Sequence, residues 1–478
     1  MISKSFLTNE FPAGLKMSAV TPLPKIDNPT EPSHFRPIST QPFLSLLTEK
    51  CAKLQLTKYI NDNDIMYKGQ FGFRKGHSCE TAMIALTEFM YREINLGKIC
   101  LLLSLDIAKG FDTIIREFLY EKLGWYGIDP TWFKSYMSYR CQFVKGQNGK
   151  TSSVKFTLRG TCQGSVLGPL IFSIYINDLP LVVKNCLCIL FADDSQLILS
   201  GHPKNIGQLL LKLKTDLEEV IKWMNENGLS LNLNKTQFII IGNAHNIKTI
   251  GQVSFEVDGT TIINTDTIKT LGLTLDSKLK WYDHINKLSR SYHLAAKSLL
   301  PLKPLLSQFN FKRLFNACVQ SLCNYMSIIY GNANLKTLKI LEKAQRFGAR
   351  LLLNKSKFDP VKYNIYNDLK WFLPHDNYQY KCLIFMYSVV VLDNLPYFGS
   401  VFLSNREIHT HQTRSNNNLH RSFLPRNDYG RRSLAHNAVI HWNDLSVDVR
   451  QSASVDIYKH KVKNIIIQKC MTKLQPAI

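Results

Sequence analysis

Apolar runs along the chain predict buried strands that end in acidic residues. Residues 99–105 form a continuous apolar run that ends at Asp106, a pattern typical of a strand buried on both faces. A second run, 186–191, leads into two adjacent carboxylates, Asp193 and Asp194, and a third apolar run follows at once. These two runs predict a β-hairpin with two acids at its tip.

Helical periodicity and turn residues predict the remaining elements. We expect helices at 43–60, 205–227, 335–353 and through much of the chain from about residue 283. We expect strands at 229–241 and 271–275, and a hairpin within 253–263 around Asp258, Gly259 and Thr260. Five prolines within residues 22–37 forbid a long helix there, so we expect residues 1–40 to be rich in loops.

The charge of the chain points to a polyanionic partner. The 478 residues carry a formal net charge of +23, with 45% hydrophobic residues, enough for sizeable cores. From residue 301 on, 25 Lys and Arg stand against 10 Asp and Glu, so +15 of the charge lies there. Basic charge for solubility alone is the alternative, but nucleic acid is the partner that such an excess favours.

Eleven scattered cysteines, without a CxxC pair, suit reduced thiols. This pattern argues against a disulfide framework and against a structural zinc site. The first residues lack the apolar core of a signal peptide, and the longest apolar run, roughly 382–392, is too short to span a bilayer. We therefore expect a cytoplasmic or nuclear protein that is neither secreted nor bound to a membrane.

Asp106, Asp193 and Asp194 are candidate ligands for a hard cation. Acids beside apolar strands are costly to bury unless a cation compensates them. Two metal ions for nucleotidyl transfer require several carboxylates that converge from different strands. A surface turn that happens to contain two aspartates is the alternative for the hairpin tip alone.

A basic stripe is predicted on the helix at 335–353. Its members recur at intervals of three or four residues, which places them on one face: Lys336, Lys339, Lys343, Arg346 and Arg350. Such a stripe can be an ordinary solvated face, but the local charge excess favours a face that contacts phosphates.

Seven motifs in order resemble the reverse transcriptase of non-LTR (LINE-type) retrotransposons. They are His34–Ser39, Gln70–Ser78, Asp106–Asp112, Gln163–Pro169, Phe191–Asp194, Leu231–Lys235 and Leu271–Leu273. The helix at 335–353 and the segment from Tyr429 to Asn443 resemble the C-terminal region of the family. The resemblance implies an α+β fold of the right-hand polymerase type: fingers, a palm with an antiparallel sheet, a helical thumb and a mainly helical, basic C-terminal region.

The resemblance also implies roles for individual residues. Asp106, Asp193 and Asp194 would hold two Mg²⁺ ions, with Mn²⁺ as an alternative and Asp194 as the less direct ligand. Lys235 matches a general-acid lysine of related polymerases, although a solvated lysine is the alternative. These four are the expected catalytic residues.

Further residues are expected to bind the incoming nucleotide. Arg74 would pair with the triphosphate, because guanidinium groups suit phosphate oxygens. Phe111 stands at the position of the steric gate of the family and would exclude a ribose 2′-OH, with a core phenylalanine as the alternative. Gln163 and Gly164 would pack on the nascent base pair.

The nucleic acid itself is expected to contact other parts of the chain. Leu271, Gly272 and Leu273 match the primer grip, whereas Arg36 and the basic stripe on 335–353 would contact nucleic-acid phosphates. By the resemblance, residues 1–282 form the fingers and palm, 283–354 the thumb and 355–478 a basic C-terminal domain.

Two departures from the family pattern lie next to predicted site residues. Gly110 stands where the family usually has alanine, and Thr161 and Cys162 precede Gln163 where Val or Ile followed by Pro is usual. Both departures loosen the local backbone in principle. All three acids are intact.

The expected function is RNA-directed DNA synthesis with an RNA template, a DNA primer or target, and deoxynucleoside triphosphates. A group II intron or telomerase-like polymerase is a weaker version of this hypothesis. The alternative from another class is a catalytically inactive RNA-binding remnant. We expect no endonuclease in this chain, because no second constellation of acids and histidines accompanies the polymerase motifs.

Overall fold

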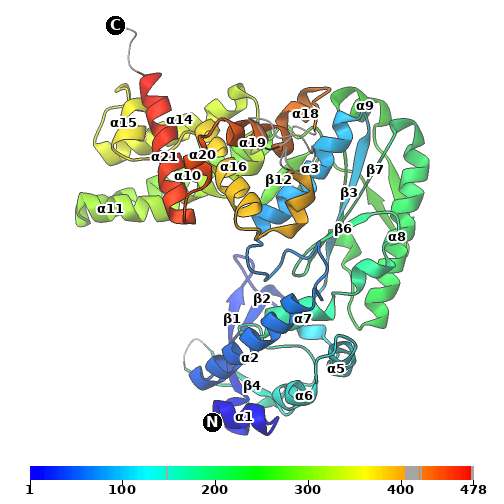
Figure 1. The fold of residues 1–478 in the computed structure, drawn as a ribbon. Coiled ribbons are helices and arrows are strands. Elements are labelled where there is room, and N and C mark those ends of the chain that lie inside the picture. The colour runs from blue at the N-terminus through cyan, green and yellow to red at the C-terminus, as the bar shows by residue number, and fades with distance from the viewer. Residues whose placement is uncertain (147–148, 404–418, 420–422, 475–478) are drawn as a thin grey trace.

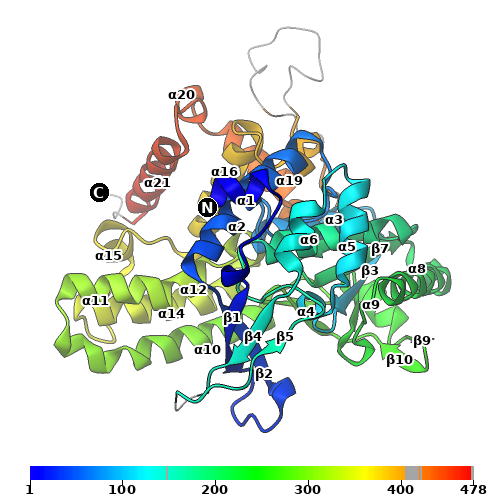
Figure 2. The same cartoon turned by 90° about the horizontal axis from the view of Figure 1, so that it is seen from below.

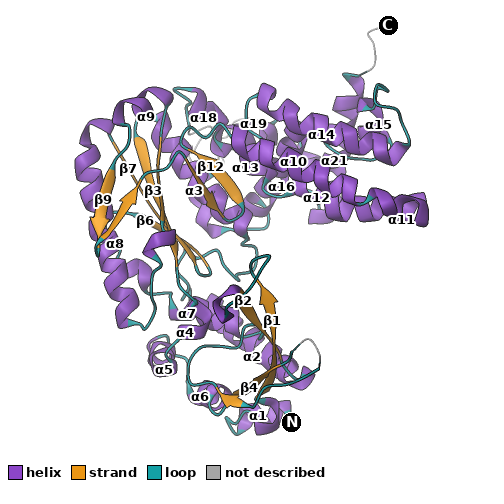
Figure 3. Cartoon of the chain, turned by 180° about the vertical axis from the view of Figure 1, so that it is seen from behind, coloured by secondary structure: helices purple, strands orange, loops and turns teal. Residues whose placement is uncertain are grey.

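The computed structural model describes residues 1–146, 149–403, 419 and 423–474, which form an open C in the view of Figure 1. The N-terminal segment lies in the lower lobe, a sheet with flanking helices lies on one side, and the C-terminal helices lie in the upper part. Figure 3 shows that strands gather in the first two of these parts, whereas the third is mainly helical.

A four-stranded antiparallel sheet in the order β6-β7-β3-β8 occupies the middle of the C. Its strands are β3 (Ile99–Asp106), β6 (Leu187–Phe191), β7 (Asp194–Gly201) and β8 (Gln237–Ile241). The predicted strand ending at Asp106 and the predicted acidic hairpin are confirmed. The strand expected at 229–241 is shorter than predicted, because Leu233–Lys235 forms a 3-10 turn before β8.

Side chains of β3 alternate between two hydrophobic cores. Leu101 and Leu103 enter one core with α7 and α8, whereas Cys100 and Leu102 enter the other with α3. These helices are α3 (Cys79–Asn95), α7 (Gly168–Tyr175) and α8 (Ile206–Glu226). Because burying one such leucine stabilises the fold by about 1.5–3 kcal/mol, the two cores together fix the position of the sheet.

The lower lobe contains a second sheet, in the order β2-β1-β4-β5 (Figure 2). Its strands are β1 (Met17–Pro24), β2 (Phe35–Thr40), β4 (Cys141–Val144) and β5 (Lys155–Phe156), and the lobe also holds α1 (Ile2–Leu7). The expectation that residues 1–40 are mainly loop is therefore wrong. Proline excludes a helix, but its fixed φ is compatible with an extended chain, and Pro22 pairs opposite Pro37 here.

Two further hairpins follow the central sheet. The predicted hairpin around Asp258 is confirmed as β9 (Ser254–Val257) and β10 (Thr260–Ile263). The next hairpin consists of β11 (Thr267–Thr270) and β12 (Leu273–Asp276). Leu271 and Gly272 form its turn rather than the start of a strand, with φ of 45° and 83°. Positive φ at both turn residues matches the twist of a two-residue hairpin.

The other elements are helical, as predicted. The lower lobe also contains α2 (Phe43–Asp62) and α6 (Thr131–Met137). The other helices before residue 282 are α4 (Gly110–Thr113), α5 (Arg116–Trp125) and α9 (Ala244–Ile250). The upper part contains α10 (Tyr282–Ser298), α11 (Gln308–Phe315), α12 (Ser321–Asn324), α13 (Ser327–Tyr330), α14 (Leu335–Leu353), α15 (Lys362–Asn367), α16 (Pro374–Val390), α18 (Asp428–Arg432), α19 (Leu434–Asn443), α20 (Val447–Arg450) and α21 (Val455–Thr472). No helix in the described ranges is long and apolar enough to cross a bilayer.

One hydrophobic core joins α3 to the helices of the upper part. Met83 of α3, Tyr292 of α10, Leu341 of α14 and Tyr458 of α21 all belong to it. The C-terminal helices therefore pack on the central sheet through α3. The division at residues 282 and 354 stays a prediction.

Candidate active site

Asp106, Asp193 and Asp194 lie together at one end of the central sheet. Asp106 ends β3, and Asp194 begins β7 directly opposite it in register. Asp193 occupies the two-residue turn between β6 and β7, where Ala192 has a φ of 56°. Because opposite residues of antiparallel strands project to the same face, the strand register brings the predicted acids together.

The pKa values of Asp193 and Asp194 are raised above the usual range of an aspartate. Partial burial, then the charges of Asp193 and Asp106, raise the pKa of Asp194 to about 6. Partial burial and the charge of Asp106 also raise the pKa of Asp193, against the opposing effect of Arg36. Like charges that share one place favour the protonated form, so a bound cation would relieve the repulsion among them.

The donor set fits a hard divalent cation, because it offers carboxylate oxygens from facing strands. Asp106 and Asp193 line one cavity. Asp194 lies on the side of Cys79, whose thiol pKa is raised by burial and by the charge of Asp194. Among the described residues, no three acidic, histidine or cysteine side chains converge into a ready metal cage. Asp106 and Asp193 are thus the better-placed ligands.

A cavity of about 820 Å³ opens beside Asp106 and Asp193. Its lining includes the basic residues Lys25, Arg36, Lys109 and Lys235. Lys235 Nζ lies 3.7 Å from Asp106 Oδ2, and its side chain is 71% exposed. A cavity that combines carboxylates with exposed cationic groups can accept a phosphate chain together with divalent cations.

Phe111 lines the same cavity and is held by other aromatic rings. Its ring stacks on Phe172 with centroids 4.7 Å apart, and it forms an edge-to-face pair with Phe73 with centroids 6.4 Å apart. A Cβ on Gly110 would lie 2.9 Å from the Phe172 ring. The glycine that departs from the family pattern therefore makes room for the ring on which Phe111 stacks.

Gln163 and Gly164 also reach the cavity. The Gln163 amide donates to both carboxylate oxygens of Asp112 at 2.9 Å, and the Gln163 carbonyl accepts from the Ser39 amide at 2.7 Å. Burial raises the pKa of Asp112, and the hydrogen bonds from Gln163 oppose this shift. The 162–169 loop is thus fixed between β2 and the segment after β3.

Arg74 lies outside the cavity lining. Its Nη1 donates to the carbonyls of Tyr67 and Gln70 at 3.1 and 3.2 Å. These bonds fold the segment that runs beside β6, where the Phe71 amide donates to the Leu190 carbonyl at 2.8 Å. Arg74 therefore stabilises the backbone of this segment. Its pairing with a triphosphate stays a prediction.

The predicted primer-grip residues divide between surface and core. Leu271 is the tip of the β11–β12 hairpin, and its carbonyl accepts from the Tyr325 hydroxyl at 2.8 Å. Gly272 lines a second cavity, of about 600 Å³, together with Lys269 and Lys287. Leu273 is fully buried. Of the three predicted residues, only Leu271 and Gly272 therefore have backbone atoms that a ligand could reach.

The basic stripe on α14 is only partly free. Its three lysines, Lys336, Lys339 and Lys343, are exposed. Arg346 pairs with Glu342 in the same helix, and Arg350 Nε donates to the Asp359 carbonyl at 3.0 Å. Three of the five predicted phosphate contacts therefore remain open to solvent.

Residues 23–275, just over half of the chain, match the family described as reverse transcriptase (RNA-dependent DNA polymerase). The chain belongs to the reverse transcriptase family. The resemblance in the seven motifs and the right-hand polymerase fold are thereby confirmed. Divalent-metal dependence is general in this family.

Curated relatives extend the match beyond the family domain. The chain is 28% identical over 355 residues to the probable RNA-directed DNA polymerase from transposon BS of Drosophila melanogaster, which covers 70% of this chain and 38% of that protein. It is 25% identical over 292 residues to the RNA-directed DNA polymerase from mobile element jockey of the same fly, covering 59% and 31%. The chain thus spans well under half of either relative.

Among solved structures, telomerase from Candida tropicalis in complex with a fragment of telomeric RNA is 11% identical to this reverse transcriptase. The match covers 84% of this chain and 67% of that chain at a TM-score of 0.39. A score this low carries no argument about the site.

Two basic residues of the cavity were missed by sequence reasoning. Lys109 lies three residues after Asp106, and its backbone φ of 51° turns the chain before Phe111. Lys25 reaches the cavity because β1 pairs with β2, and its amide donates to the His34 carbonyl at 2.7 Å. Proximity to the acidic motif was a usable signal for Lys109, whereas nothing local marks Lys25.

Replacing Gly164 with alanine should destabilise the reverse transcriptase. Gly164 has a φ of +119°, and a Cβ there would collide with the Ser39 carbonyl oxygen. We expect Gly164→Ala to lower the unfolding free energy by about 1–3 kcal/mol, the usual cost of such backbone strain. Urea denaturation measures this change.

Gly207→Ala is the matched control, because Gly207 lies in α8 with open space where its Cβ would be. Alanine there should be neutral or stabilising by about 0.5–1 kcal/mol. Equal unfolding free energies for the two variants would show that the 162–169 loop does not need glycine at position 164.

Proposed function

We propose that this reverse transcriptase is an RNA-directed DNA polymerase that extends a DNA 3′-OH along an RNA template. The observation that carries the proposal is the register of β3 and β7, which sets Asp106 opposite Asp194 with Asp193 in the adjoining turn. Membership of the reverse transcriptase family supports the same class of reaction.

Asp106 and Asp193 would hold two Mg²⁺ ions, with Mn²⁺ as an alternative and Asp194 as a weaker ligand. Bound ions would lower the pKa of the primer 3′-OH and stabilise the charge of the departing pyrophosphate. The clustering of the acids supports this assignment, because burial and then neighbouring carboxylate charge raise the pKa of both Asp193 and Asp194, and a bound cation would offset both effects.

Cationic side chains of the cavity would bind the triphosphate. Lys25, Arg36 and Lys109 line the cavity and would neutralise phosphate oxygens. Lys235 Nζ, beside Asp106 and largely exposed, would donate a proton to the leaving pyrophosphate as a general acid. Arg74 would bind the triphosphate if its hydrogen bonds to the Tyr67 and Gln70 carbonyls were released when the substrate binds.

Phe111 and the 162–169 loop would select the nucleotide. Phe111 would lie under the sugar, where its ring excludes a 2′-OH. Gln163, oriented by Asp112, and Gly164 would face the nascent base pair. The Gln163 side chain is held by Asp112, and the Phe111 ring is held by Phe172. Side chains fixed in this way can select a nucleotide, because selection depends on holding the reacting groups in a defined geometry.

The RNA–DNA hybrid would lie between the cavity and the upper helices. Leu271 and Gly272 would contact the primer backbone, with Leu273 as their buried support. Arg36 and the exposed lysines of α14 would contact phosphates, with Arg346 and Arg350 as weaker candidates because protein groups already engage them. The net charge of +23 supports such contacts.

RNA template, DNA primer or target, and deoxynucleoside triphosphates are thus the proposed partners. We propose a cytoplasmic or nuclear location, which the eleven free thiols support. The expectation that endonuclease activity is absent from this chain stays a prediction.

Replacing Phe111 with valine should let the enzyme incorporate ribonucleotides. A 2′-OH against the ring loses its water without a partner, which costs about 1–3 kcal/mol, or about 5- to 150-fold in rate. The measurement is the ratio of kcat/KM for dTTP to that for UTP on poly(rA)/oligo(dT), which should fall. Phe309→Val, at an exposed phenylalanine of α11, is the control, and a ratio that stays constant in both variants would make Phe111 a core residue.

Asp193→Asn should abolish primer extension while RNA–DNA binding stays close to that of the unaltered chain. The substitution removes one charge from a crowded acidic site, so folding should not suffer. Asp258→Asn is the matched control, because Asp258 is an exposed acid in another two-residue hairpin turn. Extension by the Asp193 variant at the parental rate would contradict the proposed function.

A further inference from the structure

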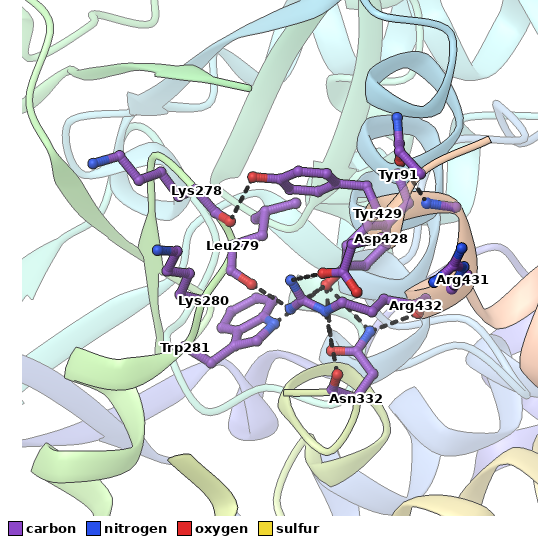
Figure 4. Close-up of polar contacts among 12 residues, drawn as sticks. Tyr91, Lys278, Leu279, Lys280, Trp281, Asn332, Asp428, Tyr429, Arg431 and Arg432 are labelled. Carbon is purple, nitrogen blue, oxygen red and sulfur yellow. Dashed lines mark hydrogen bonds and ion pairs between the residues drawn. The ribbon is translucent and has the colours of Figure 1, made fainter. Parts of the chain in front are cut away.

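A C-terminal segment, residues 425–435, lies against three parts of the polymerase that are distant in sequence. Figure 4 shows its Tyr429 and Arg432 directed toward Tyr91 of α3, the loop after β12 and Asn332 before α14. The segment contains α18, which lies beside α3 in Figure 1. None of the roles proposed above uses it.

The segment is fixed to the end of α3 through Asn95. Asn95 Oδ1 accepts from the Arg426 amide at 2.7 Å, and the Asn427 side chain donates to the Ile94 carbonyl at 3.1 Å. A Cβ on Gly430 would collide with Asn95. The backbone of α18 can approach α3 this closely because residue 430 is glycine.

Arg432 connects all three parts. Its guanidinium donates to the Leu279 carbonyl, to the Tyr91 hydroxyl at 3.2 Å and, through Nε, to the Asn332 carbonyl at 3.2 Å. It also lies over the Tyr91 ring at 5.5 Å. A guanidinium offers five donors in a fixed fork, so one side chain can hold these acceptors at once.

Tyr429 supports the same loop from the other side. Its hydroxyl lies 3.1 Å from the Gly242 carbonyl at the end of β8 and 3.2 Å from the Lys278 carbonyl. Lys278 and Leu279 lie two and three residues after the end of β12. The segment thus ties the root of this hairpin to the central sheet.

The loop that the segment holds is strained. Leu279 and Trp281 have φ of 49° and 63° although neither is glycine, and both are fully buried. Non-glycine residues in this conformation are strained and persist only where their surroundings fix them. Trp281 is also held by Tyr91, whose hydroxyl accepts from the indole at 3.3 Å.

The hairpin in turn contacts the strand that carries Asp194. Gln196 of β7 donates to Thr270 Oγ1 at 3.2 Å, two residues along the strand from Asp194. Thr270 immediately precedes the Leu271–Gly272 turn. A shift of the hairpin root would therefore move the turn relative to the acids.

We infer that Tyr429 and Arg432 are positioning residues for polymerisation, which fix the β11–β12 hairpin and hence the primer end against Asp106, Asp193 and Asp194. This inference rests on the proposed function. Polymerisation needs the primer 3′-OH in line with the reacting phosphate, and a misplacement of about 1 Å can cost roughly 100-fold in rate. The C-terminal segment would thus set the rate of the reaction without touching the substrate.

The test compares Arg432→Ala with Arg431→Ala in the full chain. Arg431 is the adjacent residue, is exposed and points away from the network (Figure 4), so both variants lose the same charge. Tyr429→Phe removes a single hydroxyl and serves if Arg432→Ala fails to fold. Two quantities are measured: the single-turnover rate of dTTP addition per titrated active site on poly(rA)/oligo(dT), and amide hydrogen exchange within residues 267–281.

We expect Arg432→Ala to lower the single-turnover rate by about 10- to 100-fold, with the dissociation constant for the RNA–DNA hybrid unchanged. Exchange within 267–281 should become faster. Tyr429→Phe should show both effects more weakly, and Arg431→Ala neither.

If Arg432→Ala only reduced the amount of folded enzyme, the number of active sites would fall while the rate per active site stayed unchanged. An unchanged rate per active site would overturn the inference. Unchanged exchange within 267–281 in both the Arg432 and Tyr429 variants would overturn it as well. If the unaltered chain adds no nucleotide, the proposed function fails, while the exchange measurement still decides whether these residues hold the hairpin.

Discussion

The register between β3 and β7 holds three like charges in one place. Backbone pairing sets Asp106 opposite Asp194, and the tight turn before Asp194 adds Asp193. Like charges directly opposite each other destabilise a sheet. Burial first, and the neighbouring carboxylate charges second, raise the pKa of both Asp193 and Asp194. Burial of both faces of β3 in separate cores offsets the repulsion, so the fold maintains an acidic site that it would not otherwise favour.

Other parts of the site depend on glycines that allow close approach of neighbouring groups. Gly72 leaves room for the Ala192 amide in the acidic turn, and Gly164 leaves room for Ser39. Gly110 admits the Phe172 ring behind Phe111. Gly110 and Gly164 line the cavity, so a side chain at either position would displace part of its wall. The cavity is therefore shaped by backbone contacts as much as by its functional side chains.

Local patterns predicted the elements that a single stretch of sequence determines. The strand at Asp106, the acidic hairpin and the helix at 335–353 follow from apolar periodicity, because burial on one or two faces imposes that periodicity. The ends of the apolar runs indicated the three acids, and the motifs identified the family.

Features made by distant contacts could not be predicted in the same way. Pro22 pairs with Pro37 in strands that composition alone assigned to loop, and Arg74 bonds to nearby carbonyls rather than lining the cavity. The contact between Asn95 and Asn427 joins residues 332 positions apart. Such contacts form only in the assembled fold, and no pattern within a short stretch of sequence predicts them.

Binding of Mn²⁺, measured by electron paramagnetic resonance, tests most directly whether the strand register creates a cation site. Titrations would compare the unaltered chain with Asp106→Asn, both with poly(rA)/oligo(dT) and dTTP present. Our account predicts Mn²⁺ binding to the unaltered chain that weakens strongly when Asp106 loses its charge. Equal Mn²⁺ binding by the two proteins would show that Asp106 and its neighbours across the sheet do not form the metal site.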